Sequence, residues 1–281
     1  MKKNFYYTVL YFFLFITTIA AQPKRLGHQE KKDTTTFNLI KFISGDFTYL
    51  NVDLFNNLYI ITSNNQLKKM ASNGDSVAVY NDIKKFGALS YIDVSNPFKI
   101  LLYFKKYTSL VTLDQLLTFR NSINLRSKNI FNVNAVATSY DNNIWVFDER
   151  DYKLKKIDDK GTPISESADL RMITDEFPSP SAILEHNNQL YIYDENKGFF
   201  IFDYYGSMKN KLPFLHWKNP SIERNCIYGF VEQSLFSYEL NSLNLQEYKM
   251  PDLMNTYSCI KAVNKKLYVL KKEGIYIYQI N

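Results

Sequence analysis

Apolar and polar positions along this chain alternate in short runs, as in β-strands, rather than at helical spacing. The clearest unit is residues 142–159, NNIWVFDERDYKLKKIDD, in which an Asn-rich turn leads into an apolar and aromatic run at 144–147. A charged loop follows, and then a second run whose apolar positions are Tyr152, Leu154 and Ile157. This pattern predicts a β-hairpin of two short strands.

The same hairpin pattern recurs five more times. The six hairpins begin at Leu58, Ile100, Ile144, Leu190, Ile227 and Leu267, at intervals of 37 to 46 residues. Such a period is typical of a four-stranded propeller blade, and hairpins that cannot bury their own apolar faces do so by closing into a ring. We therefore predict an all-β fold, a six-bladed β-propeller. A seven-bladed ring is the structural alternative, but the sequence contains no seventh hairpin.

Shorter strands complete the predicted blades. We expect first strands at 48–52, 90–94, 134–138, 181–185, 221–224 and 258–263, and fourth strands at 76–80, 117–123, 162–166, 208–212 and 245–250. The last repeat has no fourth strand of its own, whereas the apolar run 37–43 has no repeat of its own. We predict that 37–43 pairs beside the C-terminal hairpin and closes the ring, which removes exposed strand edges. One short surface helix is expected within 168–177.

The first 21 residues have the pattern of a secretory signal peptide. Lys2 and Lys3 precede an apolar stretch at 6–19, and the small residues Ala20 and Ala21 follow it. The alternative is a membrane anchor, but the stretch is shorter than the ~20 apolar residues that a span needs. The expected organisation is a signal peptide at 1–21, a flexible polar leader at 22–36 and a single propeller domain at 37–281.

Composition fits a strand-rich globular protein. Aromatic residues make up 16% of the chain, and residues of this type are enriched in strands. Removal of Lys2 and Lys3 lowers the formal net charge from +6 to +4, too little to indicate nucleic acid as a partner. After cleavage of the signal we expect no direct insertion into a membrane.

The chain offers little recognisable chemistry. His28, His186 and His216 fall in the leader, in a turn and in a blade-to-blade connection, so a shared metal site is not expected. Carboxylates in loops could assemble a calcium site, but solvated ion pairs are the commoner arrangement; they are Asp148, Glu149, Asp151, Asp194, Glu195 and Glu273. Nucleophile-elbow, Walker and Rossmann patterns are absent. We expect a protein that is not an enzyme and binds no cofactor.

The connection 213–225, PFLHWKNPSIERN, is the most suggestive segment for binding a partner. Phe214, His216 and Trp217 are candidate anchors there, because aromatic residues are enriched at interface hot spots. The alternative is that Trp217 folds back onto the blade edge. Propeller geometry places Lys105, Lys106 and Arg150, with Glu149 and Lys197, on the same face, which predicts a broad surface of mixed charge that binds protein.

Two cysteines, Cys226 and Cys259, lie at strand positions of neighbouring repeats. In an exported protein they can form a disulfide, but strand cysteines are also commonly buried free thiols. Both interpretations stay open.

Four segments carry a family resemblance: DNNIWVFDE at 141–149, KLKKID at 153–158, NNQLYIYDE at 187–195 and GIYIYQIN at 274–281. With them the chain resembles a family of exported six-bladed propellers, the plug proteins of the type IX protein secretion translocon. A fainter similarity is to NHL-type propellers, whose Gly and Asp spacing is largely missing. The matching residues form blades, so no functional residue is carried over.

The resemblance implies a periplasmic protein that docks on the periplasmic opening of a very large outer-membrane barrel and occludes it. The protein would be a monomer within that hetero-complex. Two other classes stay open: a periplasmic binding module for a glycan, peptide or assembly partner, and a propeller hydrolase, lyase or cyclase. A deep axial cavity with converging acids would favour an enzyme, and a flat or plugged axis with an aromatic-rich face would favour docking.

The signal-peptide hypothesis makes a simple prediction. N-terminal sequencing of the protein recovered from its native envelope should begin at Ala21 or Gln22. A first residue of Met1 in that material would contradict cleavage.

Overall fold

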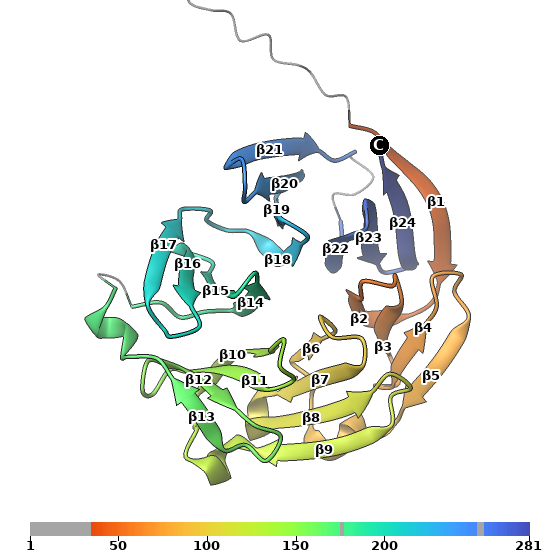
Figure 1. Cartoon of the computed structure of the whole chain (residues 1–281). Helices are drawn as coiled ribbons and strands as arrows, with labels where there is room; N and C mark the ends of the chain where they lie inside the picture. Colours follow the sequence, from red (N-terminus) through yellow and green to blue (C-terminus); the bar gives the residue numbers. More distant parts are fainter. Residues whose placement is uncertain (1–34, 175–176, 252–255) are drawn as a thin grey trace, which may run out of the picture. The chain divides into compact units, whose positions relative to one another are not determined.

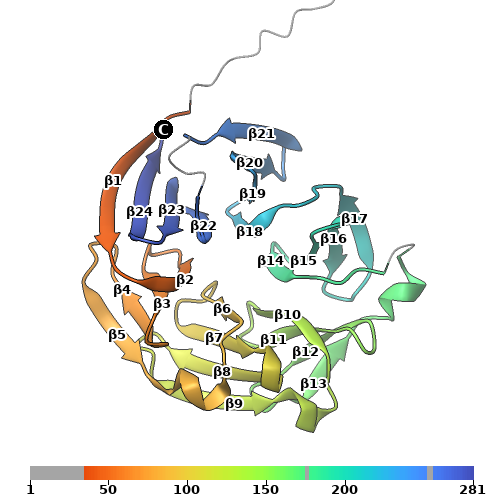
Figure 2. The same ribbon diagram turned by 180° about the vertical axis from the view of Figure 1, so that it is seen from behind.

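The computed structural model describes residues 35–174, 177–251 and 256–281, and within them 24 strands form six four-stranded antiparallel sheets. The sheets stand in a ring as six blades of a β-propeller, with the first strand of each blade nearest the axis (Figure 1). The reverse view shows the same radial order (Figure 2). The predicted fold class is confirmed. In the described ranges, no helix has the length and apolar character needed to cross a bilayer.

The blades follow the chain in order. Blade 1 contains β2 (Phe47–Val52), β3 (Leu58–Thr62), β4 (Leu67–Met70) and β5 (Ser76–Tyr80). Blade 2 contains β6 (Tyr91–Asp93), β7 (Lys99–Phe104), β8 (Ser109–Asp114) and β9 (Phe119–Asn124). Blade 3 contains β10 (Val133–Thr138), β11 (Ile144–Asp148), β12 (Lys153–Ile157) and β13 (Pro163–Glu166).

The second half of the ring repeats this arrangement. Blade 4 contains β14 (Ala182–His186), β15 (Gln189–Asp194), β16 (Gly198–Asp203) and β17 (Met208–Leu212). Blade 5 contains β18 (Lys218–Glu223), β19 (Cys226–Val231), β20 (Ser234–Glu239) and β21 (Asn244–Lys249). Blade 6 contains β22 (Cys259–Val263), β23 (Lys266–Lys271), β24 (Gly274–Ile280) and, from the other end of the described chain, β1 (Phe37–Ser44).

Strand β1 closes the ring as predicted. It pairs antiparallel with β24 from Phe37 opposite Ile280 to Ser44 opposite Gly274, with one irregularity between Leu39 and Lys41. Backbone hydrogen bonds between Thr36 and Asn281 extend this ladder at 3.1 and 3.2 Å. The two ends of the propeller are therefore held by one continuous strand pair.

Short-range turn chemistry explains why the hairpins form. Asn56, Asn142 and Asn264 take positive φ values of 63°, 64° and 51° in the turns between first and second strands, a conformation that Asn tolerates. In the turns between third and fourth strands of blades 2, 3 and 4 an Asp side chain caps the loop. Asp158, for example, accepts the backbone N–H groups of Lys160 and Thr162, each at 2.8 Å. Asp114 and Asp203 accept two N–H groups in the same way.

The core consists of six apolar clusters, one between each pair of neighbouring blades. In β7, Ile100 and Leu102 pack into the cluster shared with blade 1, whereas Leu101 and Tyr103 pack into the cluster shared with blade 3. The middle strands are thus buried on both faces. Fourth strands such as β13 and β21 are largely exposed.

Local differences from the expected elements are small. The helix expected within 168–177 is a 3₁₀ turn of three residues, Leu170–Met172, and residues 175 and 176 lie outside the described ranges. Three 3₁₀ segments were not expected: Asp82–Phe86, Lys105–Tyr107 and Leu125–Lys128. The signal peptide and nearly all of the leader also lie outside the described residues.

Deletion of residues 37–44 should lower the free energy of unfolding by more than about 4 kcal/mol, or prevent folding, because it exposes the edge of β24 and opens the ring. Ile40 is an exposed residue at the β1 irregularity, so Ile40→Thr is the control and should change stability by less than about 0.5 kcal/mol. Urea unfolding followed by circular dichroism measures both. A deletion variant as stable as the parent would contradict closure by β1.

Candidate functional site

The ring has two faces, distinguished by their turns. The turns between first and second strands and between third and fourth strands lie on one face, which we call the pocket face. The turns between second and third strands and the blade-to-blade connections lie on the other, the connection face. These definitions follow from the antiparallel order of each sheet.

A cavity of about 330 Å³ opens on the pocket face at the axis. The first strands of blades 1, 2, 4, 5 and 6 line it, and the apolar part of its wall includes Leu54, Leu184 and Ile222. Its charged lining residues are Asp53, Asp93, Glu185, Glu223, Arg224 and Lys261. We call this cavity the axial pocket.

The first two acids of the axial pocket support the blades. Asp53 accepts hydrogen bonds from the backbone N–H groups of Phe55 and Asn57 and from the Asn57 amide, each at 2.9 Å, and from the Tyr59 hydroxyl at 3.1 Å. Asp93 accepts the N–H of Ser95 at 2.8 Å and reaches across to the N–H of Thr138 in blade 3 at 2.6 Å. Both carboxylates hold turns and neighbouring first strands in place.

The other two acids also have structural partners. Glu185 accepts the Tyr140 N–H at 3.0 Å and the indole N–H of Trp145 at 2.8 Å, and a further hydrogen bond comes from the Tyr204 hydroxyl. Glu223 accepts the N–H of Asn264 at 2.8 Å and so joins blade 5 to blade 6. None of the four shows the arrangement of a free general acid or base.

Lys261 is different, because no hydrogen bond or ion pair joins its amine to any described residue. It is half-buried in β22, and burial lowers the pKa of its amine, while Cys259 and Asp93 act in the opposite direction. Burial also raises the pKa of Tyr91, the neighbouring aromatic of the pocket, well above its usual value. At neutral pH the Tyr91 hydroxyl therefore keeps its proton.

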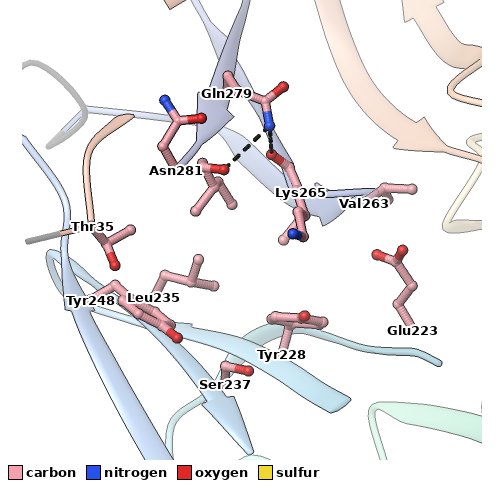
Figure 3. Close-up of a pocket in the computed structure, with 12 residues that line it drawn as sticks. Thr35, Glu223, Tyr228, Leu235, Ser237, Tyr248, Val263, Lys265, Gln279 and Asn281 are labelled. Carbon is pink, nitrogen blue, oxygen red and sulfur yellow. Dashed lines mark hydrogen bonds between the residues drawn. The ribbon is translucent and has the colours of Figure 1, made fainter. Parts of the chain in front are cut away.

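A second cavity, of about 400 Å³, lies between blades 5 and 6 beside Thr35 and Asn281 (Figure 3). Tyr228, Leu235 and Tyr248 line it on the side of blade 5. The side-chain amide of Gln279 donates to the backbone oxygens of Lys265 and Ile280 at 3.0 and 3.2 Å. The cavity is larger than the axial pocket, and its Gln279 side chain already serves the closing blade.

Among the residues predicted to bind a protein partner, Trp217 lies in the hydrophobic core. Its side chain is 4% exposed, stacks on Phe214 with 4.7 Å between ring centroids, and lies over Gly229, where an added Cβ would meet the indole at 2.3 Å. The backbone N–H of Trp217 donates to the Tyr193 hydroxyl at 2.5 Å. Of the two alternatives, folding back onto the blades is what the structure shows, and Trp217 has no surface to offer a partner.

The other predicted residues do share the connection face. Lys105, Lys106 and Arg150 are exposed in turns between second and third strands, and His216 is exposed in the connection between blades 4 and 5. Phe214 is half-buried beneath that connection. The Arg150 guanidinium lies 4.7 Å from the centroid of the half-exposed Phe131 ring, which is cation–π geometry.

Both cysteines are free thiols. Cys226 follows the turn between the first and second strands of blade 5 on the pocket face, whereas Cys259 begins β22 near the connection face and donates to the Leu50 carbonyl oxygen at 3.2 Å. Each is the first residue of its strand, but the two strands run in opposite directions, so the thiols lie on opposite faces of the ring and the structure does not form the disulfide.

Among the described residues, His186, His216 and the loop acids form no shared site, and His28 lies outside the described ranges. His186 contacts the Asn225 amide oxygen at 3.0 Å on the pocket face, while His216 lies on the connection face. Asp148 is fully buried against Lys155 at 2.8 Å, and Asp151 contacts the same amine. In the described parts of the chain, no three His, Cys, Asp or Glu side chains gather as a metal site would require.

Sequence reasoning missed Lys261. A signal was present, because Lys261 interrupts the apolar residues of the predicted first strand 258–263, and first strands line the axis. Tyr91 and Ser221, which line the same pocket, lie in other blades, and no local motif links them to Lys261.

No protein-family model matches this chain, and no curated protein matches it by sequence. Similar solved structures are propellers. The β-propeller domain of Cps50 (Swd1) from Myceliophteria thermophila has a TM-score of 0.59 at 10% identity, with 88% of this chain and 100% of that chain covered. Virginiamycin B lyase from Staphylococcus aureus has a TM-score of 0.56 at 12% identity, covering 88% and 89%. The Neurospora crassa Pan2 WD40 domain has a TM-score of 0.55 at 10% identity, covering 88% and 86%.

The chain is a six-bladed β-propeller. At such low identity the similarity shows the fold and no function, since propellers host unrelated activities.

Trp217→Ala should lower the free energy of unfolding by about 3–5 kcal/mol, because it leaves a cavity between blades 4 and 5. Leu215→Ala, in the same connection but exposed, is the matched control and should cost less than about 0.5 kcal/mol. Equal effects of the two substitutions in urea unfolding would contradict the core assignment of Trp217.

Proposed function

We propose that this protein is a non-enzymatic periplasmic propeller that docks on the periplasmic opening of a large outer-membrane secretion barrel and occludes it. The translocon in question is of type IX. Docking would occur through the pocket face, and the mechanism would be steric. The proposal rests on an exposed apolar rim, on the closed fold and on the sequence features described above.

The apolar rim of the pocket face carries the proposal. Leu54, Phe55, Phe98 and Tyr140 lie in the turns between first and second strands of blades 1, 2 and 3, and their side chains are 53–72% exposed. Phe55 and Phe98 form an edge-to-face pair across two blades, with 6.3 Å between centroids. Exposed aromatic groups of this kind are typical of protein interfaces rather than of free surface.

The closed ring suits a steric role. Each blade is packed on both sides by an apolar cluster, and β1 leaves no blade incomplete. A disc built in this way keeps its outline when it is pushed against a pore. A reversible seal of that size would use a large interface, in the range of about 1,200 Å² or more for stable complexes.

The resemblance supplies the class of partner. Its segments 141–149, 153–158, 187–195 and 274–281 fall in β11, β12, β15 and β24 and their adjoining turns. The matching segments are therefore blade-forming residues of the propeller, and the signal pattern at 1–21 favours export. The outer-membrane barrel as the docking partner follows from this resemblance.

A binding module is the second candidate, favoured by the axial pocket. An enzyme has less support, because the four pocket acids serve turns and blade contacts. The solved structures include a catalytically inactive His-to-Ala variant of virginiamycin B lyase with quinupristin. In this chain the described histidines, His186 and His216, lie on opposite faces of the ring.

The docking proposal predicts a loss of binding in Phe55→Ser/Phe98→Ser, which removes the aromatic pair of the rim. The matched control is Tyr107→Ser/Met172→Ser, which removes two exposed apolar side chains from the connection face. Pull-downs from the native envelope in mild detergent should recover a very large outer-membrane barrel with the parent and the control. Recovery with the rim variant should fall at least about tenfold, as expected when hot-spot residues are removed.

Thermal melts should show that both variants stay folded, because all four side chains are exposed. Parent protein that recovers no outer-membrane barrel would contradict docking on a translocon. Equal recovery by the rim variant and the parent would contradict the pocket face as the docking surface.

A further inference from the structure

The axial pocket contains hydrogen-bond donors that the protein itself does not use. Lys261 lies on the side of β22 opposite Ile260 and Ala262, which are buried in the cluster between blades 5 and 6. Its amine has no hydrogen-bond or ion-pair partner among the described residues. The charge of Asp93 acts on this amine without a hydrogen bond, because both Asp93 oxygens already accept the N–H groups of Ser95 and Thr138. A half-buried amine whose hydrogen bonds are not made is costly, so a lysine in this position indicates a ligand that accepts them.

Two hydroxyl groups in the same pocket are also unused. The Ser221 oxygen is buried and has no partner, and no hydrogen bond joins the Tyr91 hydroxyl to a described residue. By contrast, the nearby Tyr49 hydroxyl already accepts the backbone N–H of Ile92 at 3.2 Å. Lys261, Tyr91 and Ser221 come from blades 6, 2 and 5, so only the closed ring brings them to one cavity.

The four carboxylates of the axial pocket limit the charge that a ligand can carry there. Asp53, Asp93 and Glu185 each accept at least two hydrogen bonds, and Glu223 accepts one from Asn264. Their acceptor sites are largely committed to turns, which disfavours a cationic ligand. Their remaining negative charge disfavours a dianion such as phosphate. Lys261 and the exposed Arg224 are the two cationic groups of the lining against these four carboxylates, so the lining tolerates at most one anionic charge, placed at the Lys261 amine.

We propose that the axial pocket binds a small organic carboxylate. The carboxylate accepts hydrogen bonds from the amine of Lys261 and from the hydroxyl groups of Tyr91 and Ser221. The apolar part of the ligand packs against Leu184 and Ile222. A cavity of about 330 Å³ is at the lower end of the size range of small-molecule sites, which fits a ligand the size of one capped amino acid.

Carboxylate binding goes beyond the proposed docking function. It needs no translocon, and it uses hydrogen-bond donors inside the axial pocket rather than the apolar rim of the pocket face. The two proposals therefore fail separately, because the carboxylate experiment uses the purified protein alone.

The test compares probes that differ only in charge: N-acetylphenylalanine against N-acetylphenylalaninamide, and N-acetylleucine against N-acetylleucinamide. Isothermal titration calorimetry on the full mature protein at neutral pH should show that at least one free acid binds with a millimolar or tighter dissociation constant. Its amide should bind at least about tenfold more weakly, because hydrogen bonds to charged groups are worth more than neutral ones.

Substitutions test which side chains donate hydrogen bonds to the carboxylate. Lys261→Met keeps the length of the side chain and should weaken binding of the free acid at least about tenfold. Lys265→Met is the matched control, because it removes an exposed lysine from the adjacent turn of the same blade, and it should bind like the parent. Tyr91→Phe removes only a hydroxyl and should weaken binding several-fold, so the assignment can be tested even if Lys261→Met does not fold.

Three results would overturn the proposal. The first is that neither free acid binds at millimolar concentration. The second is that acid and amide bind equally well. The third is that folded Lys261→Met, or Tyr91→Phe in its place, binds the acid as tightly as the parent does.

Discussion

The middle strands of every blade are apolar on both faces, and this constraint determines the rest of the structure. A single sheet cannot bury two faces by itself, so each blade needs a neighbour on either side. In β7 successive residues alternate between two clusters, with Leu102 packed toward blade 1 and Leu101 toward blade 3. Only a closed ring satisfies all six blades. The last blade has three strands from its own repeat, and β1 supplies the fourth, so one strand pair joins the two ends of the ring.

The same constraint decides which side chains remain available for function. Aromatic groups that enter the interfaces between blades become core, as Trp217 does against Phe214 and Gly229. Acids at the ends of first strands become structural because the turns need acceptors for their N–H groups, as Asp53 and Asp93 show. The groups left over are the apolar rim of the pocket face and the unpartnered donors at the axis. Both lie where the six repeats meet rather than inside any one repeat.

The solved structures with this fold illustrate how little the blade pattern says about activity. A lyase, a WD40 domain and a Cps50 (Swd1) domain superpose on this chain with TM-scores of 0.55 to 0.59 at 10–12% identity. What they share is a way to bury hairpins in a ring. Function in such folds depends on the turns and on the axial residues, which vary independently of the strands. The proposals made for this protein accordingly rest on Phe55, Phe98 and Lys261, none of which the blade pattern requires.

The sequence by itself determined the number of blades, the position of most strands and the closure by residues 37–43. These features follow from local periodicity, from turn residues such as Asn142 and Asp158, and from the missing fourth strand of the last repeat. The helix expected within 168–177 is only a 3₁₀ turn, Leu170–Met172, in the structure. Only the tertiary structure decided that Trp217 is buried, that Cys226 and Cys259 lie on opposite faces of the ring, and that Lys261, Tyr91 and Ser221 share a cavity. Those outcomes depend on contacts between blades. The curvature that closes the ring sets these contacts, and no pattern within a single repeat encodes them.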